Sequence, residues 1–242
     1  MVAPVHPGPT AFAERGEGSP AVTPADLLAL TKPRIVVFVM LTVAAGFALG
    51  VPAAATVGSA DDVLPAGLAA RLWILFHTLV GTALVAGGTN ALNQIAERDV
   101  DALMRRTQRR PLPAGRLGPG QARVFAWTIS ILGVCQLALL VNPLTAVFAA
   151  LTLASYVFAY TPLKRRTTLA TLVGAIPGAL PIVGGWTAAF APLDIRPGVL
   201  FGIMFLWQIP HFLARAWMYR ADYTRAGLKM LSVDDANGAT TF

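Results

Sequence analysis

Two carboxylates and an amide recur at helical spacing in the segment NALNQIAERDVDALMRRTQRRPLPAGR, residues 90–116. Asn93, Glu97 and Asp101 stand at i, i+4 and i+8, so a continuous helix would carry them on one face. About 20 apolar residues precede the segment, enough to span a bilayer, which places these acids at a membrane surface. They have no basic residue at matching positions, so their burial is costly unless a divalent cation or a displaced arginine pairs with them. The pattern predicts a site for a metal ion and an anion.

The same segment ends in a run of arginines that includes Arg105, Arg109 and Arg110. Arginines behind a metal site suit a polyanion held through the metal. Asp99 lies about 240° from Asn93 in helical projection and is expected to matter less. The alternative is that these charges merely solvate a loop beside a membrane span.

A second polar cluster closes the last apolar run, in WQIPHFLARAWMYRADYTRAGLKML, residues 207–231. His211 and Asp222 are about three helical turns apart and would be nearly in line on a continuing helix. An even number of spans separates the two clusters, so both face the same side of the membrane. A plain surface acid at Asp222 is the alternative.

A third basic group lies in YTPLKRRT, residues 160–167, which contains Lys164, Arg165 and Arg166. Three consecutive cations at the mouth of a bundle would neutralise a diphosphate, although membrane topology alone also places cations there. His77 lies deep in an apolar run, where it either contacts a bound porphyrin or forms a hydrogen bond inside the bundle.

The composition is that of a multi-span membrane protein: the 242 residues are 55% hydrophobic and only 13% charged, with a mean hydropathy of +0.62. The net charge of +7 does not indicate nucleic acid, because the basic residues cluster in short loops between apolar runs. The single cysteine, Cys135, allows neither a disulfide framework nor a cysteine metal site and is expected to pack in the bundle.

Six transmembrane helices are predicted, which makes the fold class all-α, a multi-span helical bundle in a lipid bilayer. The spans cover residues 35–52, 72–94, 122–141, 143–161, 169–190 and 198–217. The connections rich in Lys and Arg follow the second and fourth spans, which predicts a cytoplasmic N-terminus. The Pro-, Gly- and Ala-rich residues 1–25 are expected to form a disordered tail rather than a signal peptide, and LTKPR puts Lys32 and Arg34 directly before the first span.

Several of these motifs resemble one family. N-x-x-x-E-R-D-x-D followed by M-R-R-T-x-x-R-P is similar to the first acidic motif of the UbiA-type intramembrane prenyltransferases, specifically the branch that farnesylates protoheme. LTKPR, YTPLKRRT, P-H-F and D-Y-x-x-A-G-x-x-M-L resemble the same branch. The chain departs from the wider pattern at Glu97, where many members have aspartate, and at Met218, where an aspartate often stands four residues before Asp222.

The resemblance implies a donor, an acceptor and a metal. Farnesyl diphosphate would give its farnesyl group to a vinyl group of protoheme IX (heme B), forming heme O, with Mg²⁺ as cofactor. The implied metal ligands and catalytic residues are Asn93, Glu97, Asp101 and Asp222, and the implied substrate-binding residues are Arg105, Arg109, Arg110, Lys164, Arg165 and His211. The location would be the cell inner (plasma) membrane, with heme-pathway or terminal-oxidase assembly proteins as partners.

Family members have nine spans, so residues 26–242 are expected to form a UbiA-type domain that is short at its C-terminus and turns over poorly without further helices. The chemistry of the residues alone reaches only a prenyl diphosphate, because a charged mouth before an apolar interior suits a diphosphate head with a hydrocarbon tail. Two alternatives remain open: a UbiA-type enzyme that prenylates a quinone precursor, and a transporter in which the acids form an ion path.

Overall fold

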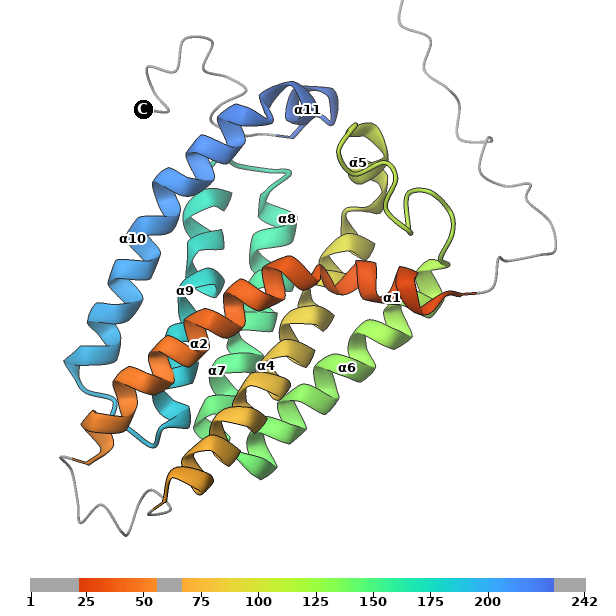
Figure 1. Cartoon of the computed structure of the whole chain (residues 1–242). Coiled ribbons are helices and arrows are strands. Elements are labelled where there is room, and N and C mark those ends of the chain that lie inside the picture. Colours follow the sequence, from red (N-terminus) through yellow and green to blue (C-terminus); the bar gives the residue numbers. More distant parts are fainter. Residues whose placement is uncertain (1–21, 56–66, 229–242) are drawn as a thin grey trace, which may run out of the picture.

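The computed structural model describes residues 22–55 and 67–228, and these form helices joined by turns, without strands (Figure 1). Of the predicted tail, residues 1–21 lie outside the described residues, and Pro24 already begins the first helix. The helices, in chain order, are α1 (Pro24–Thr31), α2 (Pro33–Ala54), α4 (Leu68–Ala96), α5 (Arg98–Leu103), α6 (Pro119–Leu140), α7 (Pro143–Ala154), the π-helical turn η2 (Ser155–Tyr160), α8 (Thr161–Leu163), α9 (Ala170–Ala188), α10 (Ile195–Met218) and α11 (Arg220–Arg225).

Within the described residues, six helices are long and apolar enough to cross a bilayer, which confirms the predicted fold class and number of spans. They are Pro33–Ala54, Leu68–Ala96, Pro119–Leu140, Pro143–Leu163, Ala170–Ala188 and Ile195–Met218. The fourth runs without interruption through α7, η2 and α8. The observed ends lie within a few residues of the predicted ones. Hydropathy locates the apolar part of a span, but not the exact residues at which its helix begins and ends.

Small residues bring the spans together. A Cβ added at Gly46 of α2 would collide with the backbone carbonyl of Ile182 in α9, and one added at Gly185 of α9 would collide with the carbonyl of Val43 in α2. These two helices therefore touch backbone to backbone. Lipid tails are as apolar as leucine, so spans associate through this kind of close packing rather than through a hydrophobic driving force.

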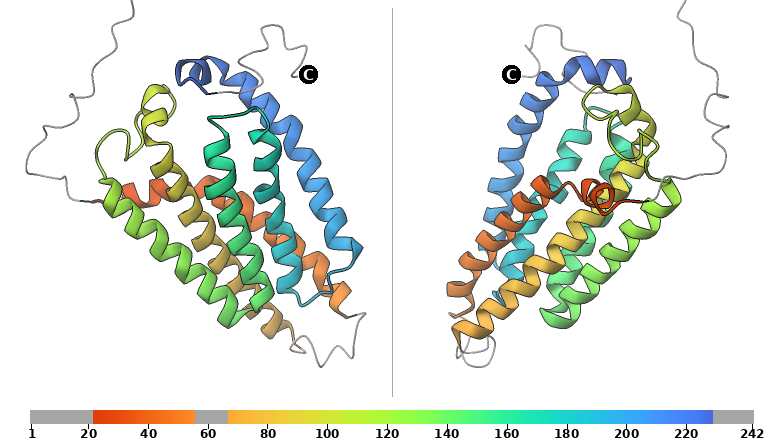
Figure 2. Two further views of the ribbon diagram at one scale, coloured as in Figure 1. Left: turned by 180° about the vertical axis from the view of Figure 1, so that it is seen from behind. Right: turned by 45° about the vertical axis from the view of Figure 1, so that its right-hand side comes forward.

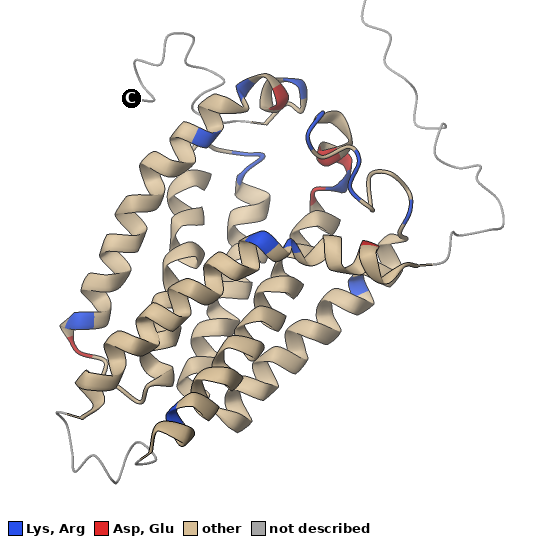
Figure 3. Cartoon of the chain, in the orientation of Figure 1, with Lys and Arg blue, Asp and Glu red and all other residues tan. Residues whose placement is uncertain are grey.

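The bundle has one strongly charged end. Figures 2 and 3 show α5, α11 and the connection after α8 gathered at that end, where most lysines, arginines and acids lie. The opposite end carries a smaller charged group, in which Arg196 pairs with Asp194 at 2.6 Å. None of the acidic residues in the described part of the chain falls inside a span.

Two isolated polar side chains differ in their settings. Nε2 of Gln136 on α6 donates a hydrogen bond to Nδ1 of His77 on α4 at 3.2 Å, so of the two interpretations the structure has the hydrogen bond inside the bundle. Cys135, which was expected to pack, is instead exposed on α6. The expectation was wrong because position 135 points away from α4, whereas its neighbours Gly133 and Leu137 face that helix.

Replacing Gly46 with alanine should lower the unfolding temperature of the purified protein in detergent by several degrees. The new methyl group would meet backbone atoms of α9, which cannot move aside as a flexible side chain can, so the two helices must separate. Gly202→Ala on α10 is the matched control, because nothing lies within 4 Å of its added Cβ. Equal unfolding temperatures for the two variants would contradict the close contact of α2 with α9.

Candidate functional site

Polar side chains from four segments converge at the charged end of the bundle. We call this set the polar mouth; its members are Lys32, Asn93, Glu97, Asp101, Arg110 and Lys164. Asn93, Glu97 and Asp101 are buried, with exposed fractions of 3%, 7% and 1%. Ionised groups this far from water require partners.

The three residues that the sequence placed on one helix face do share a face, although the helix is not continuous. Helix α4 ends at Ala96, Glu97 occupies a turn, and α5 follows. Across that break the Glu97 amide donates to the Asn93 carbonyl at 2.9 Å, and the Asp101 amide donates to the Glu97 carbonyl at 2.8 Å. The four-residue spacing therefore survives the change of helix. The side chain of Asp99 points outward, 81% exposed, beside Arg98.

Cations from the connection after α5, from the segment after α8 and from the start of α2 pair with these polar groups. Arg110 Nη1 lies 2.6 Å from Asp101 Oδ2, and Lys164 Nζ lies 3.2 Å from Glu97 Oε1. The Lys32 ammonium donates to Asn93 Oδ1 at 3.1 Å. The sequence left two ways to neutralise the buried acids, a divalent cation or a displaced arginine. Among the described residues, basic side chains from other segments pair with the acids.

Asn93 is also held from the other side. Its Nδ2 donates to Thr161 Oγ1 at 3.3 Å, and the Thr161 hydroxyl donates to the Tyr156 carbonyl at 2.8 Å. Thr161 follows the π-helical turn η2, which widens the helix by one residue. The amide of Asn93 is thereby fixed between Lys32 and the fourth span.

The polar mouth has a surplus of positive charge when all its groups are ionised, since Lys32, Arg110 and Lys164 face only Glu97 and Asp101. Burial, followed by repulsion from Arg110, lowers the pKa of Lys32 to about 7. Burial also opposes the charge on Lys164, but Tyr160 and Glu97 outweigh it and the pKa of Lys164 is raised. Lys32 therefore loses its proton more readily than Lys164 does when no anion lies beside it.

Asp222 lies at the same end, as predicted, but outside these ion pairs. Its Oδ1 accepts from the Arg105 amide at 3.4 Å and from Arg225 Nη1 at 3.0 Å. Val100 and Met104 pack with Tyr223 beneath this contact, so α11 is joined to the connection that follows α5. In residues 22–55 and 67–228 no three His, Cys, Asp or Glu side chains are close enough to form a metal site by themselves.

The remaining predicted binding residues have different settings. Arg165 Nη2 donates to the Ala96 carbonyl at 2.9 Å and so caps the end of α4. Arg105 and Arg109 are exposed, whereas Arg110 turns inward to Asp101. His211 lies away from the polar mouth, in the wall of a cavity, with its ring stacked on Trp207.

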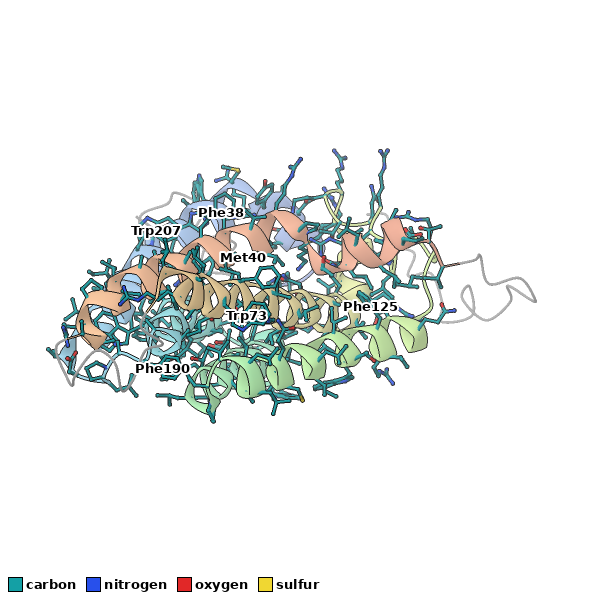
Figure 4. The ribbon with its side chains drawn as sticks, turned by 60° about the horizontal axis from the view of Figure 1, so that its bottom comes forward. Phe38, Met40, Trp73, Phe125, Phe190 and Trp207 are labelled. Carbon is teal, nitrogen blue, oxygen red and sulfur yellow. The ribbon has the colours of Figure 1, made fainter. Side chains whose placement is uncertain are left out.

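A cavity of about 740 Å³ lies between α2, α4, α7, α9 and α10. Asn90 and Tyr156 line it near the polar mouth, and Leu137 and Thr145 line it toward the opposite end. Its wall is mostly apolar, and Phe38 of α2 and Trp207 of α10 lie on the same side of the molecule in Figure 4. A polar head at the mouth and a long apolar body in the cavity would both be accommodated.

Sequence reasoning missed Lys32 and Thr161 as site residues. Lys32 was attributed to membrane topology, because a cation directly before a span is expected there in any case. Its neighbour Arg34, the other cation of LTKPR, is exposed. The left-handed backbone at Lys32, with φ of 52°, turns its side chain inward, and no local pattern announces that conformation.

The model of the UbiA prenyltransferase family matches residues 39–241. A protoheme IX farnesyltransferase of Solibacter usitatus is 48% identical over 216 residues, which cover 89% of this chain and 72% of that protein. One from an Anaeromyxobacter species is 46% identical, covering 86% and 65%, and one from Koribacter versatilis is 41% identical, covering 89% and 66%. The chain thus spans about two thirds of the length of these relatives.

Solved structures share the fold. A UbiA homologue from Archaeoglobus fulgidus bound to GPP and Mg²⁺ superposes with a TM-score of 0.66 at 17% identity, covering 86% of this chain and 69% of that one. A digeranylgeranylglyceryl phosphate synthase gives a TM-score of 0.65 at 14% identity, covering 88% and 69%. At such low identity the likeness extends to the arrangement of helices alone.

Replacing Lys32 with methionine should raise the unfolding temperature more at pH 6.5 than at pH 9. The pKa of Lys32 is about 7 in the folded protein, below the ordinary lysine value of 10.5 that applies to the unfolded chain. The unfolded chain therefore binds more protons between these two values, and wild-type stability rises with pH. The cost of the buried charge is fully present below pH 7, and it changes by at most about 1.4 kcal/mol per pH unit above.

The matched control is Arg34→Met, since Arg34 is the neighbouring cation but is exposed, and its removal should act equally at both pH values. Unfolding in detergent followed by tryptophan fluorescence would serve as the measurement. A pH-independent effect of Lys32→Met would show that Lys32 keeps an ordinary pKa in the folded protein.

Proposed function

The chain belongs to the UbiA prenyltransferase family, and on that premise we propose that the whole protein transfers the farnesyl group of farnesyl diphosphate to a vinyl group of protoheme IX, forming heme O. The observation that carries the proposal is the polar mouth, where buried acids and a surplus of cations stand directly before an apolar cavity of about 740 Å³. The choice of protoheme is supported by relatives of that name at 41–51% identity.

The donor atoms of the polar mouth fit Mg²⁺. The ion takes oxygen ligands and is commonly bound by one or two carboxylates together with substrate phosphates, rather than by a cage made of protein alone. Glu97 and Asp101 provide two buried carboxylates, and Asn93 provides an amide oxygen beside them. These residues would hold the ion, and Asp222 would join them only by leaving Arg105 and Arg225. Bound there, Mg²⁺ would neutralise charge on the departing diphosphate.

The protein's own groups would bind the diphosphate and keep water away. Lys32, Arg110 and Lys164 supply positive charge to phosphate oxygens in a site of low dielectric, where such interactions are strong. In the proposed reaction the bond between C1 of the farnesyl chain and the diphosphate oxygen breaks, and the electron pair leaves with the diphosphate. The vinyl electrons form the new bond to C1, and water adds to the electron-deficient carbon with loss of a proton. The apolar cavity would keep other water from the allylic cation.

The proposed location is the plasma membrane, with the polar mouth and the N-terminus on the cytoplasmic side. Support comes from the arginines between α4 and α6 and from the cations after α8, because short loops rich in Lys and Arg stay in the cytoplasm. Proteins that supply heme B or receive heme O are the partners this location suits.

The transporter alternative requires acids spread through the depth of the membrane. In the described residues the acids lie only outside the six spans, which favours the enzyme. Incubation of the protein with farnesyl diphosphate, heme B and Mg²⁺, followed by mass spectrometry, tests the proposal. Formation of heme O supports it, whereas prenylation of 4-hydroxybenzoate or a naphthoate without heme O would assign the protein to quinone synthesis.

Replacing Asp101 with asparagine should abolish turnover, whereas Asp99→Asn should leave it within a few-fold of wild type. Both changes remove one carboxylate from the same short helix, but only Asp101 is buried beside Arg110. Heme O formation at saturating substrates is the measurement, with elution on size exclusion as the check on folding. Equal losses in the two variants would show that the face carrying Asn93, Glu97 and Asp101 is not the reactive one.

Replacing Arg110 with glutamine should raise the KM for farnesyl diphosphate by roughly tenfold or more, the usual scale for a lost charge-assisted hydrogen bond. Arg109→Gln should have a small effect, because that side chain is exposed and forms no ion pair among the described residues. The KM for heme should stay nearly constant in both variants. A raised heme KM with an unchanged donor KM would reverse the role assigned to Arg110.

A further inference from the structure

One cation lies in the cavity rather than in the polar mouth. Arg215 of α10 lines the cavity and is the only lysine or arginine of the described residues that does so. Its guanidinium forms no ion pair or hydrogen bond with the described residues. Three other cations at this end do have partners: Arg225 pairs with Asp222, Arg106 lies over the ring of Tyr219, and Arg220 lies over that of Trp217.

A flat aromatic surface lies next to Arg215 on the same face of α10. Trp207 and His211 stack with their ring centroids 5.1 Å apart and their planes 15° apart, and both line the cavity. His211 and Arg215 are four residues apart, so they are neighbours along the helix. Trp207 is 58% exposed, which leaves much of the stacked pair free to contact a ligand.

The donor does not account for this arrangement. The charge of farnesyl diphosphate is confined to its head, which Lys32, Arg110 and Lys164 meet at the polar mouth, and its tail is a hydrocarbon. The Arg215 side chain is exposed beside the cavity, near the end of α10, so its guanidinium is free to meet an anionic group of a ligand bound there. The acceptor differs from the donor because protoheme is a flat macrocycle that carries two propionate carboxylates.

We propose that Arg215 binds a propionate carboxylate of the acceptor while the stacked pair of Trp207 and His211 packs against the macrocycle. Guanidinium is the cation best matched to a carboxylate, because its planar fork can form two parallel hydrogen bonds. This proposal rests on the proposed function and assigns α10 to the acceptor, as the polar mouth is assigned to the donor. The pair of contacts orients the macrocycle, so that one edge faces C1 of the farnesyl chain.

The test combines a protein variant with a change in the substrate. Arg215→Gln should raise the KM for heme B roughly tenfold or more and leave the KM for farnesyl diphosphate unchanged. Heme B whose two propionates are methyl esters should show a similar loss with the wild type. With Arg215→Gln the diester should cause little further loss, because the contact it removes is already absent. Arg215→Lys should recover part of the affinity.

Arg220→Gln is the matched control: it removes a cation from the neighbouring turn, outside the cavity, and should change neither KM. A raised KM for farnesyl diphosphate in Arg215→Gln would overturn the proposal. So would a KM for the diester in Arg215→Gln that rises by the product of the two separate effects, because independent effects would mean that Arg215 does not contact a propionate.

The affinity for heme B in the absence of the donor, measured from the heme absorbance, distinguishes this proposal from the proposed function. If the wild type makes no farnesylated heme yet binds heme B more tightly than Arg215→Gln does, the proposed function fails and the acceptor site stands. If the two proteins bind heme B equally, the acceptor site fails.

Discussion

Burial of two carboxylates at a membrane surface is the constraint on which the rest of the structure depends. Asp101 and Glu97 are almost inaccessible to solvent, and each is paired with a cation from another segment, Arg110 and Lys164. Removing one member of such a pair leaves an uncompensated buried charge, at a typical cost of about 3–5 kcal/mol. The end of α4, the connection before α6 and the end of the fourth span must therefore meet at one place, which closes one end of the cavity.

The backbone is irregular near the polar mouth, where it orients the buried polar side chains. The break between α4 and α5 falls at Glu97, and the π-helical turn falls directly before Thr161, which holds Asn93. In this wider turn the Tyr156 carbonyl, five residues before Thr161, accepts from the Thr161 hydroxyl. Away from the mouth, close packing at Gly46 and Gly185 keeps the spans regular and rigid.

The sequence predicted what local periodicity determines. The six spans follow from hydropathy, and the shared face of Asn93, Glu97 and Asp101 follows from four-residue spacing, which survived a helix break that the spacing could not reveal. The sequence could not predict which cations pair with the buried polar groups. Lys32 and Arg34 look alike before a span, and so do Arg109 and Arg110 within their loop. One of each pair turns inward because of backbone conformation and packing, which depend on segments far away in the chain.

The division of charges at this end of the bundle suits two substrates that are held by different groups. Positive charge at the polar mouth exceeds the acid charge there, and burial, followed by repulsion from Arg110, lowers the pKa of Lys32 to about 7. An enzyme that met both substrates with one cluster would discriminate poorly between a diphosphate and a carboxylate. Arg215 on α10, beside the apolar cavity and apart from the ion pairs of the mouth, would give the carboxylate of the proposed acceptor a separate partner. In the proposed reaction the farnesyl tail would enter the cavity while its C1 stays between the two charged regions, where the new bond would form.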